Sequence, residues 1–135
     1  MKIFFNASIR GGRRDLPLYK EIVEELKKYG EVITRHVADE TLDVYGETQY
    51  TNTEIFEQAI KRVFEANIII SEVTTPSLGV GYIIAEGVHQ KKKQIALYSG
   101  KYTDKLSAMI KGNLGVPIFV YNSNEELQRI LKENL

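Results

Sequence analysis

The sequence contains no cysteine, so neither a disulfide framework nor thiolate chemistry is available to it. No apolar run approaches the ~20 residues of a membrane-spanning helix, and the stretch after Met1 is too short for a signal peptide. Its 18 basic and 18 acidic residues balance, which argues against nucleic-acid binding driven by bulk charge. Only His36 and His89 are histidines, and no metal-ligand spacing surrounds either. We therefore expect a cytoplasmic protein that uses no metal ion, membrane or nucleic acid.

What the sequence does contain is typical of one globular α/β domain. Its 135 residues suffice for one core, and hydrophobic and charged residues make up 43% and 27% of the chain. Helical segments are expected after caps at Asp15, Thr51 and Ser123, and over about Gly81–Gln90 and Leu106–Lys111. Strands are expected between them, at Lys2–Phe5, Glu31–His36, Ile68–Ile70, Gln94–Tyr98 and Pro117–Tyr121.

Strands that alternate with helices indicate a parallel sheet covered by helices on both faces. Right-handed crossovers leave few strand orders, and 2-1-3-4-5 is the commonest for five strands. In that order the first and third strands are neighbours, and ligands bind beyond their carboxyl ends. The loops at that point are Asn6–Arg14 and Glu72–Gly81, and both contain glycine. We therefore predict a ligand site built from these two loops.

The two loops carry groups that suit a phosphate. Arg10, Arg13 and Arg14 flank Gly11 and Gly12, so guanidinium groups accompany backbone that a ligand can approach closely. The helix expected to begin near Gly81 adds backbone N–H donors and a favourable dipole, and Ser77 adds a hydroxyl. The sequence thus favours a small phosphorylated ligand, with a solvated arginine cluster as the alternative. The irregular segment 37–52 is long enough to be a lid or binding loop.

Five segments in chain order resemble the 2'-deoxynucleoside 5'-phosphate N-hydrolases of the nucleoside 2-deoxyribosyltransferase superfamily. They are Ser8-Ile-Arg-Gly-Gly-Arg13, His36-Val-Ala-Asp39, Glu72-Val-Thr, Pro76-Ser-Leu-Gly-Val-Gly-Tyr82 and Leu106-Ser-Ala-Met-Ile-Lys-Gly112. The resemblance covers 1–135 as one nucleoside 2-deoxyribosyltransferase-like domain. It implies a flavodoxin-like, Rossmann-like homodimer that cleaves the N-glycosidic bond of deoxynucleoside monophosphates without a cofactor.

The resemblance also implies which residues bind the nucleotide. The segment around Ser107 and Met109 is expected to complete the site of the neighbouring subunit. The full set of implied or expected substrate-binding residues is Ser8, Ile9, Arg10, Gly11, Gly12, Arg13, Ser77, Gly79, Gly81, Ile83, Ser107 and Met109.

Three positions depart from the family pattern. Where the resemblance implies a nucleophilic glutamate, an assisting aspartate and a strand tyrosine, this chain has Ile83, Ala59 and Phe4. Cleavage through a covalent intermediate needs a carboxylate nucleophile and a proton donor, which these residues cannot supply. Glu86, one helical turn beyond Ile83, is a candidate replacement. Glu72 is another, although a structural role for it fits the sequence equally well.

Three functions remain open from the sequence. The first is hydrolysis of deoxynucleoside 5'-monophosphates to free base and deoxyribose 5-phosphate with a relocated carboxylate. The second is a catalytically silent homologue that binds or senses the nucleotide. The third is a nucleoside deoxyribosyltransferase, which would need the same missing nucleophile.

Overall fold

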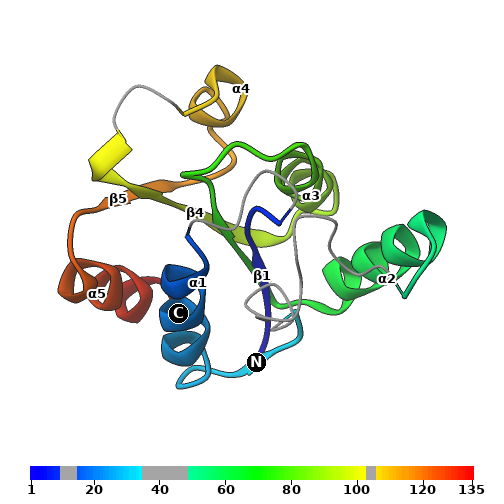
Figure 1. Ribbon diagram of the computed structural model, residues 1–135, viewed down its shortest axis with the longest axis horizontal. Helices are drawn as coiled ribbons and strands as arrows, with labels where there is room; N and C mark the ends of the chain where they lie inside the picture. The colour runs from blue at the N-terminus through cyan, green and yellow to red at the C-terminus, as the bar shows by residue number, and fades with distance from the viewer. Residues whose placement is uncertain (10–14, 35–48, 103–105) are drawn as a thin grey trace.

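The computed structural model describes residues 1–9, 15–34, 49–102 and 106–135, and these form a five-stranded parallel sheet between two layers of helices (Figure 1). The strand order β2-β1-β3-β4-β5 confirms the predicted order and fold class. The strands are β1 (Lys2–Asn6), β2 (Glu31–Val32), β3 (Ile68–Glu72), β4 (Lys93–Ser99) and β5 (Ile118–Tyr121). The helices are α1 (Leu16–Leu26), α2 (Asn52–Glu65), α3 (Leu78–His89), α4 (Ala108–Lys111) and α5 (Asn124–Asn134), with a short 3-10 helix η2 (Gly100–Tyr102) after β4.

The helices α1 and α5 cover one face of the sheet, as Figure 1 shows. Their apolar sides meet alternate residues of the central strands, so this face holds the largest core cluster. Its members include Ile3, Phe5, Tyr19, Ile22, Leu26, Ile68, Ile70, Ile95, Leu97, Leu127 and Leu131. Burial of these side chains supplies the main hydrophobic stabilisation of the domain.

The opposite face of the sheet is covered by α2 and α3, and it contains two smaller clusters. One lies under the last turns of α2 and the middle of α3, and we call it the Ile83 cluster. It consists of Phe4, Val63, Ala66, Ile69 and Ile83, with Ile33 and Ala59 at its edge. The second joins α3 to β4 through Val73, Val80, Ile84, Ala96, Tyr98 and Val116, and Ile110 of α4 packs against it.

Two elements differ from the sequence prediction. The third helix begins at Leu78 rather than near Gly81, because the hydroxyl of Ser77 accepts a hydrogen bond from Val80 N–H and caps it. The second strand ends at Val32 within the described residues. Thr34 lies in the turn that follows. Its hydroxyl accepts a hydrogen bond from the N–H of Phe5 at 2.7 Å and donates one to the carbonyl of Phe5 at 2.6 Å, in place of backbone hydrogen bonds. His36, the predicted end of that strand, lies outside the described residues.

The helix α2 confirms the predicted capping box but buries less of its apolar side than expected. Thr51 accepts from Glu54 N–H, and the Glu54 carboxylate accepts from Thr51 N–H at 2.8 Å. Only Val63 of this helix is fully buried, whereas Phe56 and Phe64 are exposed. Within the described ranges, no helix is both long and apolar enough to cross a bilayer.

Candidate functional site

The carboxyl ends of β1 and β3 lie side by side, as the predicted site requires. Asn6 pairs with Ser71 in the parallel register. The amide of Asn6 donates to the carbonyl of Val80 at 3.3 Å and to the hydroxyl of Ser71 at 3.4 Å. Because Val80 belongs to the first turn of α3, this buried side chain ties the end of β1 to the beginning of that helix. Sequence reasoning did not single out Asn6.

The first turn of α3 is open on its outer side. A Cβ atom at Gly79 would meet only the hydroxyl of Ser77, at 3.9 Å, and one at Gly81 would meet nothing within 4 Å. Packing therefore does not require glycine at either position. The positive end of the helix dipole and the backbone N–H groups at this turn form a favourable environment for an anion.

A cavity of about 690 Å³ lies between this turn and α4. Ser77 and Gly81 line it from the α3 side, and Ser107 and Met109 line it from the α4 side of the same chain, whereas the resemblance implies that Ser107 and Met109 reach the site of the neighbouring subunit. The hydroxyl of Ser107 caps α4 by accepting from Met109 N–H at 3.2 Å. Most of the remaining lining is apolar, as is typical of pockets for small organic ligands.

Ser8 and Ile9 lie at the start of the other predicted loop. Ser8 is fully buried, and its hydroxyl has no hydrogen-bond partner among the described residues. Buried polar groups are normally paired, so an unpaired hydroxyl at the edge where ligands bind in this fold is consistent with a ligand contact. Ile9 packs instead against the core beneath α1. The predicted residues Arg10, Gly11, Gly12 and Arg13 lie outside the described residues.

Glu72 is the last residue of β3 and is completely buried. Its carboxylate accepts from the hydroxyl of Thr74, from Thr74 N–H at 3.3 Å and from the hydroxyl of Tyr121 at 3.1 Å. Burial raises the pKa of Glu72 from 4.5 to about 7, against the lowering effect of these hydrogen bonds, and the charge of Asp15 adds to the increase. Burial and the charge of Glu72 also raise the pKa of Tyr121, which therefore remains a donor.

Glu72 lies on a different face of the sheet from Ile83. Its partner Tyr121 belongs to the core beneath α1 and α5, whereas Ile83 belongs to the cluster beneath α2 and α3. Glu86 is half-buried on α3, and its carboxylate accepts from the amide of Gln90 at 2.7 Å. The two candidate carboxylates therefore occupy separate environments. Glu72 accepts three hydrogen bonds in the core, and Glu86 accepts one from Gln90 on the next turn of the chain.

The Ile83 cluster brings together the three positions at which the resemblance implies reactive side chains. Phe4 is 4% exposed and Ile83 is 8% exposed, and Ala59 packs against them from α2. Strand β1 and helices α2 and α3 thus each contribute an apolar side chain at these positions. In the described part of the chain, no group of three or more His, Cys, Asp or Glu side chains could hold a metal ion.

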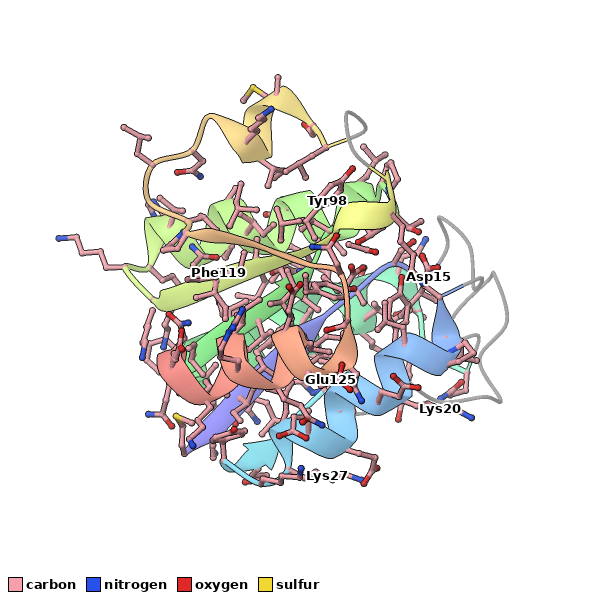
Figure 2. All side chains as sticks on the ribbon, turned by 90° about the vertical axis from the view of Figure 1, so that its left-hand side faces the viewer. Asp15, Lys20, Lys27, Tyr98, Phe119 and Glu125 are labelled. Atoms are coloured by element: carbon pink, nitrogen blue, oxygen red, sulfur yellow. The ribbon has the colours of Figure 1, made fainter. Side chains whose placement is uncertain are left out.

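Asp15 and Thr75 form a contact that the sequence did not reveal. The sequence predicted Asp15 as a helix cap, and it occupies the N-cap position of α1 without making a capping hydrogen bond. Its carboxylate accepts instead from the hydroxyl of Thr75 at 2.6 Å. Figure 2 shows Asp15 at the end of α1 that lies toward η2, at the carboxyl edge of the sheet. This hydrogen bond joins the start of α1 to the loop before α3.

Comparison with known proteins gives close relatives along nearly the whole chain. A Nematostella vectensis protein provisionally named 2'-deoxynucleoside 5'-phosphate N-hydrolase 1 is 44% identical over 135 residues, covering 93% of this chain and 86% of its own. A 5-hydroxymethyl-dUMP N-hydrolase of Danio rerio is 37% identical, covering 98% of this chain and 94% of its own.

A solved structure shares the fold at much lower sequence identity. The CMP N-glycosidase BcmB of Clostridium botulinum matches with a TM-score of 0.70 and 17% identity over the full length of both chains. No protein-family model matches. The identity to the curated relatives and the length that they cover establish the relationship, and the chain belongs to the 2'-deoxynucleoside 5'-phosphate N-hydrolase family.

Proposed function

We propose that this protein binds 2'-deoxynucleoside 5'-monophosphates at the carboxyl edge of β1 and β3. The observation that carries the proposal is the open first turn of α3, capped by Ser77, beside a cavity of about 690 Å³. A dianionic phosphate fits the N-terminal end of this helix, and the apolar cavity wall fits a less polar part of the ligand. The names of the relatives, which specify deoxynucleotides, agree with that chemistry.

The Ile83 cluster favours binding without cleavage of the N-glycosidic bond by the route that the resemblance implies. That route needs a carboxylate nucleophile and a proton donor at the sugar. Ile83 and Ala59 occupy the implied positions, and both pack in apolar surroundings. We therefore place nucleotide binding first and hydrolysis second among the functions of this chain.

A specific observation keeps hydrolysis as the second candidate. A carboxyl group with a pKa near 7 has the proton affinity that a general acid needs at neutral pH, and the pKa of Glu72 is raised to about 7. Glu86 lies one turn beyond Ile83 on the same helix and is half-buried. Either carboxylate would have to reach the anomeric carbon for hydrolysis to occur. A deoxyribosyltransferase reaction would likewise need a carboxylate that reaches the anomeric carbon.

We also propose that the protein forms a homodimer. The helix α3 is apolar on both sides, because Ile83 and Ile84 face the core while Leu78 and Tyr82 are exposed. Apolar side chains on both sides of a helix are normally buried, and Leu78 is 97% exposed in the single chain. Met109 of the neighbouring α4 segment is 83% exposed. A second copy of the chain would cover this surface.

The dimer is tested by the molar mass in solution. Leu78→Asp should convert the dimer to a monomer in light scattering, because it places a charge in the covered surface. Phe64→Asp is the control: Phe64 is equally apolar and 74% exposed, but it lies on α2. A wild-type protein that is monomeric at all concentrations would exclude the dimer.

Nucleotide binding is tested by incubating the protein with each of the four deoxynucleoside 5'-monophosphates. Thermal shift reports binding, and chromatography reports free base. Ser77→Ala should abolish most of the shift, and Ser123→Ala is the matched control, because Ser123 caps α5 with the same hydrogen bond far from the cavity. Base release that Glu86→Gln removes would establish the hydrolase. The absence of both a shift and base release would refute the nucleotide site.

A further inference from the structure

The loop between β3 and α3, residues 73–77, is held on one side by a hydrogen-bond network centred on Glu72. Three donors converge on the buried carboxylate, the hydroxyl and N–H of Thr74 and the hydroxyl of Tyr121. The hydroxyl of Thr74 in turn accepts from Ser99 N–H at 2.8 Å. A single carboxylate thus connects the loop to β5 directly and to β4 through Thr74.

The other side of the same loop faces the proposed nucleotide site. Thr75, Pro76 and Ser77 line the cavity of about 690 Å³. Thr75 also donates to Asp15 at the start of α1, so the loop is connected to the segment that follows residues 10–14. The position of Ser77, and of the first turn of α3 that it caps, therefore depends on contacts made on the far side of the loop.

We propose that Glu72 is a positioning residue for the nucleotide site, and that its ionised form holds the 73–77 loop in the geometry that binds the ligand. The proposal rests on the proposed nucleotide-binding function. The ionised carboxylate is an acceptor at both oxygens, so it can accept all three hydrogen bonds at once. The neutral acid carries a hydroxyl group of its own and loses an acceptor site. The 3.3 Å contact from Thr74 N–H is the longest of the three, and it is the one we expect to break.

Burial mainly determines the pH at which this change occurs, and the charged and titratable groups around Glu72 adjust it. Asp15 faces it from α1 and Tyr121 from β5. Glu21 and Lys101 lie further out, on the walls of a smaller cavity of about 300 Å³ that Asp15, Thr74 and Tyr121 also line. Burial places the pKa of Glu72 at about 7, so both forms are populated near neutral pH.

The experiment measures the dissociation constant of 2'-deoxyuridine 5'-monophosphate from pH 5.5 to 8.5 for the wild type and for Glu72→Gln. The glutamine resembles the neutral acid, because its amide nitrogen is a donor and cannot accept the hydrogen bond from Thr74 N–H. The ratio of the variant's constant to that of the wild type should be about tenfold at pH 8.5, the effect of one hydrogen bond to a charged group, and should approach one at pH 5.5. Taking the ratio cancels the effect that ionisation of the phosphate has on both dissociation constants.

Glu21→Gln provides the matched control, because Glu21 is an exposed carboxylate of the neighbouring cavity. Its ratio should stay near one at every pH. A ratio for Glu72→Gln that does not change with pH, while the wild type binds the nucleotide, would overturn the proposal and leave the proposed function intact. Failure of the wild type to bind would refute the proposed function instead.

A second measurement tests the positioning role without any ligand. The amide NMR signals of Thr74 and Ser77 should shift with pH, with a midpoint near 7 in the wild type and no such transition in Glu72→Gln. A purely structural contribution of Glu72 to the fold would not produce a transition at the Ser77 amide. Its absence from the wild-type spectrum would contradict the proposal whether or not nucleotide binds.

Discussion

The free energy of unfolding should decrease as the pH rises from about 4.5 to 7, because Glu72 is ionised more readily in the unfolded chain than in the fold. The pKa of Glu72 is raised from 4.5 to about 7 by burial. Between these values the folded protein holds a proton that the unfolded chain has released. Stability then decreases with pH, because its slope is proportional to the protons bound by the unfolded state minus those bound by the folded state.

The size of the effect follows from the same pKa values. A difference of one pH unit corresponds to about 1.4 kcal/mol, so the change from 4.5 to about 7 corresponds to about 3 kcal/mol. The contribution is fully present below pH 4.5 and is lost by pH 8. For a chain of this length, 3 kcal/mol changes the melting temperature by roughly 10 °C.

Urea unfolding from pH 4 to 8, for the wild type and for Glu72→Gln, isolates this term. The glutamine does not titrate, so the difference in unfolding free energy between the two proteins should change by about 3 kcal/mol across the range. Glu54 and Glu126 have lowered pKa values because Thr51 and Asn122 donate to them. Their contribution to the pH dependence of stability occurs at more acidic pH and is common to both proteins. Parallel stability curves for the two proteins would refute the reasoning.

Three further substitutions test other parts of the structure. Thr51→Ala should lower the unfolding free energy by about 1 kcal/mol because it removes the capping box of α2, whereas Thr53→Ala in the same helix should have little effect; equal urea midpoints would contradict this. Ile83→Ala should cost about 2–4 kcal/mol by opening a cavity in the Ile83 cluster, measured in the same way. Tyr121→Phe removes a donor to Glu72, so the pH-dependent loss of stability should move to higher pH.

The fold was predictable because its signals are local and its topology has few alternatives. The apolar run at Ile68–Ile70 is fully buried in β3, as predicted. The order 2-1-3-4-5 followed from right-handed crossovers, and it correctly placed the carboxyl ends of β1 and β3 side by side. The start of α3 was predicted too late, because Gly79 and Gly81 indicated a turn whereas Ser77 caps a helix that contains both.

The Glu72 network could not be predicted, because its members come from segments that are distant in sequence. Tyr121 reaches Glu72 across 49 positions, and Thr75 reaches Asp15 across 60. Threonine, tyrosine and aspartate at these positions have no periodicity that indicates a partner. The sequence predicted Asp15 as a cap from its place before a helix, and only the three-dimensional arrangement shows that its carboxylate contacts the neighbouring loop.

The Ile83 cluster gives a physical reason for the three departures that the resemblance implies to occur together. Phe4, Ala59 and Ile83 come from β1, α2 and α3 and meet in one apolar group. A carboxylate in place of the buried Phe4 or Ile83 would lie among apolar side chains, which costs more free energy than an apolar side chain there. A buried set of polar side chains in which some hydrogen bonds are missing is therefore less stable than either a fully hydrogen-bonded set or an entirely apolar one. An apolar side chain at one of these positions therefore favours apolar side chains at the other two, whereas the Ser77 cap of α3 lies at the start of the helix, before Ile83.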